Sequence, residues 1–118
     1  MDNIYERGDM HWCIVFFDEP ENKGESKKRP IFIVERGENE VYFFRITTVK
    51  GEPHQRKYRP PLLNWRMYGF SKPSYINIEV PLLIRDINVF IKATHIAKAQ
   101  KIDIQIVENR LIELGFYE

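Results

Sequence analysis

The chain has one cysteine, no long apolar run and almost no excess of either charge. Cys13 cannot form an internal disulfide, and a lone thiolate cannot supply a cysteine zinc site. No apolar run approaches the ~20 residues of a membrane span, and residues 1–10 contain no signal-peptide core. With 18 Lys and Arg against 17 Asp and Glu, the net charge of +1 gives no general attraction to nucleic acid or membrane. We therefore expect a soluble, cytoplasmic protein that forms one domain over residues 1–118.

The sequence also lacks the short motifs of nucleotide and cofactor chemistry. It has no GxxxxGK[ST], GxSxG or GxGxxG segment, so we expect no cofactor. Its three histidines, His11, His54 and His95, share no short motif, and neither a metal site nor a paired acid–base mechanism is predicted. His54 is the only one in a basic segment, which makes it a candidate substrate-binding residue. Cys13 lies in an apolar run, where we expect a buried, inert thiol.

What the chain does have is apolar and aromatic residues, at 43% and 14%, enough to build a core. β-Branched and aromatic runs between turn signals predict strands over residues 10–17, 31–35, 41–47 and 74–80. Shorter strands are expected at 82–84 and 87–91, and residues 18–28 form a polar loop. The turn at residues 37–39 joins the second and third strands so tightly that we expect them to be antiparallel.

The C-terminal segment has two possible interpretations. Residues 101–106 alternate like a strand, whereas Ile104, Val107, Leu111 and Leu114 have helical spacing, with Gly115 placed as a C-terminal cap. We predict a helix over residues 102–114, because the longer pattern with its stop signal outweighs six residues of alternation. The result is a mainly β fold with a C-terminal helix. A small barrel is favoured over an open sheet, because closure removes exposed edges.

Basic and aromatic residues are interleaved between residues 50 and 73, a segment that holds four of the seven prolines. It has six cations against one acid, Glu52, and we expect a long loop with short ordered pieces. Cations that neutralise phosphates beside rings on which bases stack are typical of single-stranded nucleic-acid sites. The alternative is a solvated loop whose aromatic side chains attach it to the barrel.

Arg29 and Thr47 are predicted to lie at the ends of neighbouring strands. In a hairpin that turns around Glu38, positions 29 and 47 are both nine residues from the centre. An arginine and a threonine hydroxyl placed together in this way can hold a phosphate between them. Alternatively, Arg29 pairs with an acid in residues 18–25.

Four short motifs, in order, resemble the pattern of the MazF/PemK toxins. They are Gly8-Asp9 before an apolar strand, Lys28-Arg29-Pro30 leading into a second, Ile46-Thr47, and the stretch at residues 69–76. The resemblance covers about residues 5–114. It implies an antiparallel SH3-like barrel (CcdB/PemK toxin-like) that forms a homodimer, is neutralised by an antitoxin protein and cleaves single-stranded RNA without a metal. In that family the corresponding arginine and threonine are catalytic, which implies Arg29 and Thr47 here.

The implied reaction is attack of an RNA 2′-hydroxyl on the adjacent phosphate, giving a 2′,3′-cyclic phosphate and a 5′-hydroxyl. Thr48 follows Thr47 where the family has a small Ala or Ser, so the reacting hydroxyl remains open between the two. The expected substrate-binding residues are Lys28, Thr48, Lys50, His54, Arg56, Lys57, Arg59, Trp65 and Ser74. The alternative is a non-catalytic barrel of the same fold that binds a protein, as the gyrase-poison toxins do, or a nucleic acid. A third hypothesis is an accessory phage or plasmid protein that retains the scaffold without toxicity.

Overall fold

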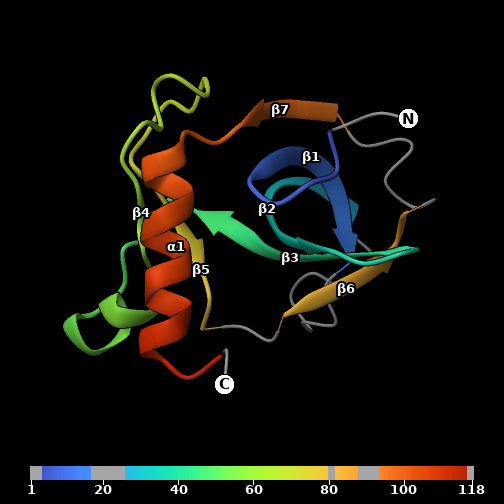
Figure 1. Cartoon of the computed structure of the whole chain (residues 1–118). Coiled ribbons are helices and arrows are strands. Elements are labelled where there is room, and N and C mark those ends of the chain that lie inside the picture. Colours follow the sequence, from blue (N-terminus) through green and yellow to red (C-terminus); the bar gives the residue numbers. More distant parts are fainter. Residues whose placement is uncertain (1–3, 17–25, 80–81, 88–93, 117–118) are drawn as a thin grey trace.

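The computed structural model describes residues 4–16, 26–79, 82–87 and 94–116, and Figure 1 shows how their strands and helices are arranged. The elements follow in chain order: β1 (Asp9–Phe16), β2 (Ser26–Arg36), β3 (Glu40–Thr47), η2 (Pro53–Tyr58), β4 (Pro61–Leu62), β5 (Ser74–Asn77), β6 (Leu83–Asp86), β7 (Thr94–Lys98) and α1 (Lys101–Glu113). No helix in these described ranges has both the length and the apolar character needed to cross a membrane.

The hairpin of β2 and β3 is the centre of the sheet, as its two apolar runs and tight turn predict. Ile31 pairs with Arg45, whereas nearer the turn Glu35 pairs with Tyr42, so Val34 is an extra residue on β2. Such a β-bulge increases the local twist of a strand pair. At the turn, the Gly37 amide donates to the Glu40 carbonyl over 2.9 Å.

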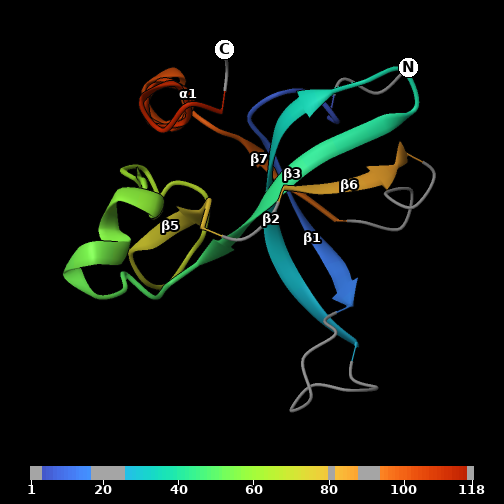
Figure 2. The same cartoon turned by 90° about the horizontal axis from the view of Figure 1, so that it is seen from below.

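All strand pairs are antiparallel, and the strand order is β4-β5-β3-β2-β1-β7. On its edge away from β2, β3 has two further partners: residues 45–47 pair with β5, and residues 40–43 pair with β6. β5 and β6 therefore lie at opposite ends of β3 and diverge from each other in Figure 2. The predicted fold class is confirmed: the sheet is a curled half-barrel of antiparallel strands with one C-terminal helix.

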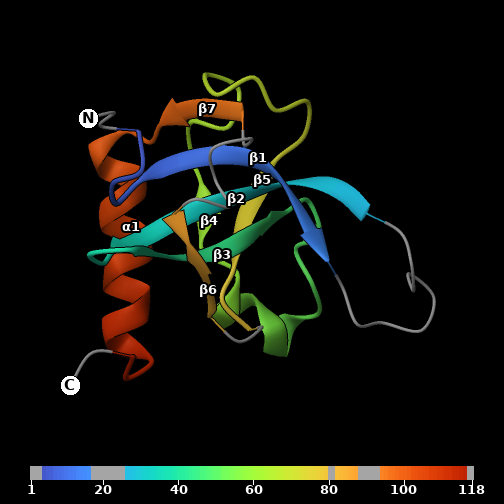
Figure 3. The same cartoon turned by 90° about the vertical axis from the view of Figure 1, so that its right-hand side faces the viewer.

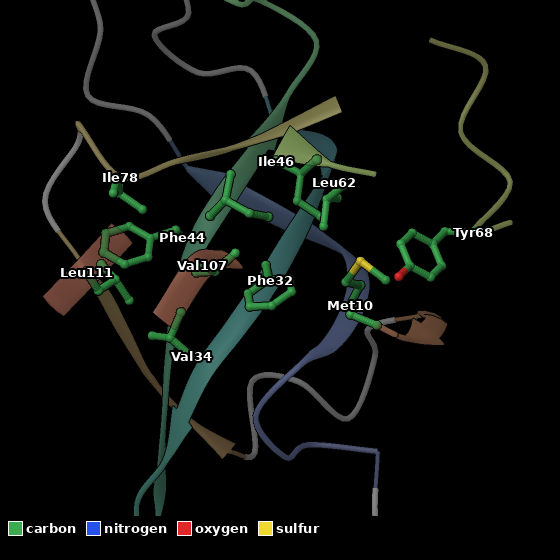
Figure 4. Packing of buried hydrophobic residues seen from close by; sticks show 12 residues of the cluster. Met10, Phe32, Val34, Phe44, Ile46, Leu62, Tyr68, Ile78, Val107 and Leu111 are labelled. Atoms are coloured by element: carbon green, nitrogen blue, oxygen red, sulfur yellow. The ribbon is translucent and has the colours of Figure 1, made fainter. Parts of the chain in front are cut away.

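The curled sheet buries side chains on both faces because successive residues of a strand point in opposite directions. On β2, Ile31 and Ile33 belong to one buried cluster, and Phe32 and Val34 to the other. α1 runs crosswise to the strands of the hairpin (Figure 3) and covers the second cluster. Figure 4 shows side chains of this larger cluster, which contains Met10, Phe32, Val34, Phe44, Ile46, Leu62, Tyr68, Ile76, Ile78, Ala99, Val107 and Leu111.

The helical interpretation of the C-terminal segment is confirmed, with bounds one residue earlier than predicted at each end. Gly115 has a φ of 81° and follows the last helical turn, as expected of a helix-ending glycine. Its amide donates to the Ile112 carbonyl over 3.0 Å, and the Phe116 amide donates to the Leu111 carbonyl over 2.9 Å. These two bonds form a Schellman motif, which satisfies carbonyls that the end of a helix leaves open.

Several predicted boundaries were wrong. β2 begins at Ser26, so Arg29 lies inside a strand and not at its junction with a loop. The cause is β1, whose extended backbone pairs Cys13 with Arg29 and Ile14 with Lys28, so ladder hydrogen bonds hold this polar sequence extended. β5 ends at Asn77 and not at residue 80, and β6 begins at Leu83 and extends to Asp86.

The remaining segments differ in how well they were predicted. β7 was not predicted, and it pairs with β1 at the end of the sheet path. The segment at 50–73 contains the predicted short ordered pieces, η2 and β4, followed by turns. Of the polar loop expected at 18–28, residues 26–28 belong to β2, and residues 18–25, which include the acids considered as partners of Arg29, lie outside the described residues. Most of the strand expected at 87–91 also lies outside them.

Candidate functional site

A cleft of about 410 Å³ lies beside the first residues of β2, the end of β3 and the segment that leads into β5. β1 contributes one residue to it, β2 three, and the end of β3 with its following turn four. The remaining residues come from the stretch before β5 and its first position. The lining consists of Trp12, Lys28, Arg29, Pro30, Ile46, Thr47, Thr48, Val49, Gly69, Phe70, Ser71, Lys72 and Ser74.

Arg29 and Thr47 both line this cleft. The last pair in the β2–β3 ladder is Ile31 with Arg45, and continuing that register by two residues puts Arg29 opposite Thr47. This is the pairing predicted from a hairpin centred on Glu38. Arg29 is an exposed residue and Thr47 is half-buried, and both contribute to the lining of the same cleft.

The Thr47 hydroxyl already makes one contact. Its oxygen accepts a hydrogen bond from the Val49 amide over 3.1 Å. A hydroxyl has one hydrogen to donate besides its acceptor sites, so Thr47 keeps the capacity to donate to a bound anion. Thr48 lines the same cleft and is exposed.

The charge of the cleft favours an anion. Lys28, Arg29 and Lys72 line it, and none of the described lining residues is acidic. A concave surface that carries charge of one sign concentrates ligands of the opposite sign. The cleft can therefore bind phosphate groups, and a guanidinium beside a hydroxyl can hydrogen-bond to phosphate oxygens.

Aromatic rings form another part of the cleft. Trp12 and Phe70 meet edge to face, with ring centroids 6.2 Å apart. Trp12 is 37% exposed although it belongs to an almost continuous apolar run. Sequence reasoning did not predict Trp12 as a site residue, and it included Phe70 only as one ring of the basic and aromatic segment at 50–73. The apolar run concealed the outward direction of Trp12, and period-two alternation would not have revealed it, because Met10 and His11 are both buried and the β1–β7 register shifts between them.

The structure brings together five of the residues predicted for the site: Arg29, Thr47, Lys28, Thr48 and Ser74. Ser74 is buried, and its hydroxyl donates to the Lys72 carbonyl over 2.9 Å, so this hydroxyl holds the chain next to the cleft. The other predicted residues, all described, are not among those that line the cleft: Lys50, His54, Arg56, Lys57, Arg59 and Trp65.

Part of the basic and aromatic segment packs against the molecule, as its alternative interpretation proposed. Arg59 has a side chain only 9% exposed, donates to the Val49 carbonyl over 2.7 Å and pairs with Glu79 at 3.3 Å. Tyr58 and Trp65 pack against the larger buried cluster. These contacts hold the segment to the sheet.

The remaining titratable candidates lie away from the lining. Burial raises the pKa of the Cys13 thiol to about 11, so it is protonated at neutral pH. His11 is fully buried, His54 is exposed on η2, and His95 Nε2 lies 2.9 Å from Asp9 Oδ1. Within the described ranges, no group of three or more His, Cys, Asp or Glu side chains is placed to hold a metal ion.

Comparison with known proteins gives structural matches only. No family model matches the sequence, and no curated protein matches it. MazF of Deinococcus radiodurans (crystal form I) superimposes with a TM-score of 0.66 at 16% identity, covering 98% of this chain and 100% of that one. A MazE–MazF complex of the same organism (form II) gives 0.67 at 16% identity, covering 99% and 100%. A further complex (form III) gives 0.67 at 12%, covering 98% and 99%. Over almost its whole length, this chain has the fold of MazF.

Proposed function

We propose that the chain is a toxin-type endoribonuclease that cleaves single-stranded RNA without a metal ion. The observation that carries the proposal is that Arg29 and Thr47 line one cationic cleft on a MazF fold. The resemblance of the sequence motifs to those of the MazF/PemK toxins implies the same two residues. Fold alone does not define an activity, so the proposal rests on the chemistry of the cleft.

The proposed reaction starts with the 2′-hydroxyl of RNA attacking the neighbouring phosphorus. The O2′–P bond forms and the P–O5′ bond breaks, leaving a 2′,3′-cyclic phosphate and a 5′-hydroxyl. The 2′-oxygen loses its proton and the departing 5′-oxygen gains one. Negative charge accumulates on the non-bridging oxygens at the midpoint, where fixed hydrogen-bond donors lower the barrier most.

Arg29 and Thr47 have separate roles in this proposal. The Arg29 guanidinium stabilises the charge on the pentacoordinate phosphorus, and the Thr47 hydroxyl donates to a non-bridging oxygen. An arginine remains protonated at neutral pH because its pKa exceeds ~12, so Arg29 is not the group that removes the 2′ proton. Lys28 and Lys72 attract neighbouring phosphates of the strand.

The aromatic part of the cleft supports an unpaired strand as substrate. Trp12 and Phe70 offer ring surface beside the cations, and unpaired bases stack on such surfaces. In a duplex the bases already stack on each other and their faces are not available. The crystal structures of MazE–MazF complexes support a second part of the proposal, namely an antitoxin partner that binds and neutralises a homodimer of this chain.

The test is to incubate the purified chain with a long single-stranded RNA in the presence of EDTA. Arg29→Ala is the test variant. Arg66→Ala is the matched control, because it removes the same charge from an exposed side chain outside the cleft lining. Discrete fragments ending in a cyclic phosphate, lost in Arg29→Ala and retained in Arg66→Ala, are the expected result.

Two other results would contradict the proposal. RNA that is bound tightly but left intact points to a non-catalytic barrel that binds nucleic acid. RNA that is neither cut nor bound points to a protein target, with gyrase as the first to test. Growth arrest on expression, relieved by Arg29→Ala, would separate a toxin from an accessory protein without toxicity.

A further inference from the structure

The segment Gly69–Lys72, called here the cleft wall, supplies Gly69, Phe70, Ser71 and Lys72 to the candidate site. All but Phe70 are exposed, so the wall has little buried surface of its own to hold it in place. It is attached at both ends by buried side chains. Ser74 holds the end nearer β5 through the Lys72 carbonyl, and Tyr68 holds the other end.

Tyr68 is held by the carboxylate of Asp103 in the first turn of α1. Asp103 has no exposed surface, and its carboxylate accepts four hydrogen bonds from the segment before the cleft wall. The Leu63 amide donates over 2.7 Å, the Asn64 amide over 3.3 Å and the Asn64 side-chain Nδ2 over 3.1 Å. The Tyr68 hydroxyl is the fourth donor.

These four donors to the carboxylate are all neutral groups. A buried carboxylate is tolerated only where such donors replace its water shell. The Asp103 carboxylate therefore needs the donors of residues 63–68, and those residues are held in place by their bonds to it. Burial and the bond to Asp103 raise the pKa of the Tyr68 phenol, which therefore keeps its proton. The Tyr68 oxygen also accepts the Gln100 amide over 2.7 Å, so the same hydroxyl is attached to the start of the helix twice.

Contacts continue from Tyr68 into the cleft. The Tyr68 ring lies in the larger buried cluster beside Met10 (Figure 4) and meets Phe70 edge to face at 6.5 Å. Phe70 in turn meets Trp12 at 6.2 Å. The Phe70 amide donates to the Trp65 carbonyl over 3.1 Å, so a backbone hydrogen bond also connects the cleft wall to the turn that precedes it.

We propose that Asp103 is a positioning residue for RNA binding: it fixes Tyr68, and through it the aromatic and cationic side chains of the cleft wall. The proposal rests on the proposed ribonuclease function. Asp103 does not line the cleft, so it acts through the wall and not on the RNA. The wall carries neither Arg29 nor Thr47. Loosening it therefore weakens substrate binding and leaves the chemical step nearly intact.

The test compares Asp103→Asn and Tyr68→Phe with Val107→Ala. Asp103→Asn keeps the shape but loses the charge and one acceptor, and Tyr68→Phe removes only the hydroxyl. Val107→Ala is the control, because it destabilises α1 from a buried position one turn away from Asp103 that does not line the cleft. All assays are run well below the melting temperature of each variant.

The first readout is hydrogen exchange of the amides at residues 63–72. Losing a hydrogen bond to a charged group should speed exchange there by about tenfold or more, while exchange in β2 and β3 stays as in the native chain. The second readout is RNA cleavage. KM should rise by about tenfold while kcat changes by less than about twofold, as expected when an interaction common to ground and transition states is removed. Val107→Ala should show neither effect.

Unchanged exchange at residues 63–72 in both variants would overturn the proposal. So would a KM that rises equally in Val107→Ala at matched stability, because the effect would then be one of general destabilisation. If Asp103→Asn does not fold, Tyr68→Phe alone decides. If the native chain does not cut RNA, the proposed function fails first, and hydrogen exchange still tests separately whether Asp103 holds the wall.

Discussion

The hydroxyl oxygen of Thr47 accepts a hydrogen bond from the Val49 amide over 3.1 Å, which orients a side chain that lines the cleft. Thr47→Val removes the hydroxyl at nearly constant volume and should lower kcat by about 10²–10³-fold, the cost of one lost donor to a developing oxyanion. Thr47→Ser should retain most of the activity. Thr48→Val is the matched comparison: Thr48 also lines the cleft as a predicted binding residue, so this variant should raise KM and leave kcat nearly unchanged. Loss of cleavage in Thr48→Val with retention in Thr47→Val would assign the role to Thr48.

His11 should make the fold less stable in mild acid. Burial, the largest cause, lowers its pKa from 6.5, with His95 adding to this effect and the Ile4 carbonyl and Asp9 opposing it. The unfolded chain therefore binds a proton that the folded chain does not, and the free energy of unfolding falls as the pH drops below about 6.5. Urea denaturation at pH 5, 6 and 7 measures this fall.

His11→Phe keeps a ring to stack on Tyr5 and should reduce that fall. His54→Phe is the control, because His54 is exposed, and the pH dependence should persist in it. The explanation is wrong if His11→Phe loses stability between pH 7 and 5 as steeply as the native chain does.

Cys13 should behave as an inert thiol. Burial raises its pKa to about 11, so at pH 8 its thiolate fraction is about a hundredfold smaller than that of an ordinary thiol, and only the thiolate reacts. Alkylation by iodoacetamide should be correspondingly slow in the folded chain and fast in urea. Cys13→Ala should cleave RNA at the native rate. Rapid alkylation of the folded chain, with loss of cleavage, would show that the thiol is accessible and close to substrate.

The central hairpin was predictable because its signals are local. A turn at Gly37 between two apolar runs specifies an antiparallel pair, and the centre assumed at Glu38 matches the register beyond Val34. This match depends on the bulge at Val34. Nearer the turn, Glu35 pairs with Tyr42, and without the bulge that register would place Arg29 opposite Thr48 instead of Thr47. The residue pattern does not indicate the extra residue at Val34. The predicted pairing of Arg29 with Thr47 therefore depended on a bulge that could not be read from the sequence.

The errors occur where tertiary pairing decides the structure. Ser26–Arg29 has the composition of a loop, and it is extended because β1 pairs with it. β7 is short and partly polar, so its sequence lacks the alternation by which a half-buried strand is recognised. It is extended because it pairs with β1. The site shows the same limit. A count of cations in residues 50–73 cannot tell Lys72, which lines the cleft, from Arg59, whose guanidinium is buried against Glu79 and the Val49 carbonyl.

Trp12 should contribute to RNA binding through stacking and not to the chemical step. One base stacked on an aromatic side chain contributes about 1–3 kcal/mol, so Trp12→Ala should raise KM by roughly 10- to 100-fold with little change in kcat. Trp12→Phe keeps a ring against Phe70 and should recover most of the affinity. Binding is measured directly by quenching of Trp12 fluorescence in a Trp65→Phe background, which leaves one tryptophan in the chain. Double-stranded RNA of the same sequence should neither quench that fluorescence nor be cut, and efficient cleavage of the duplex would contradict the stacking role.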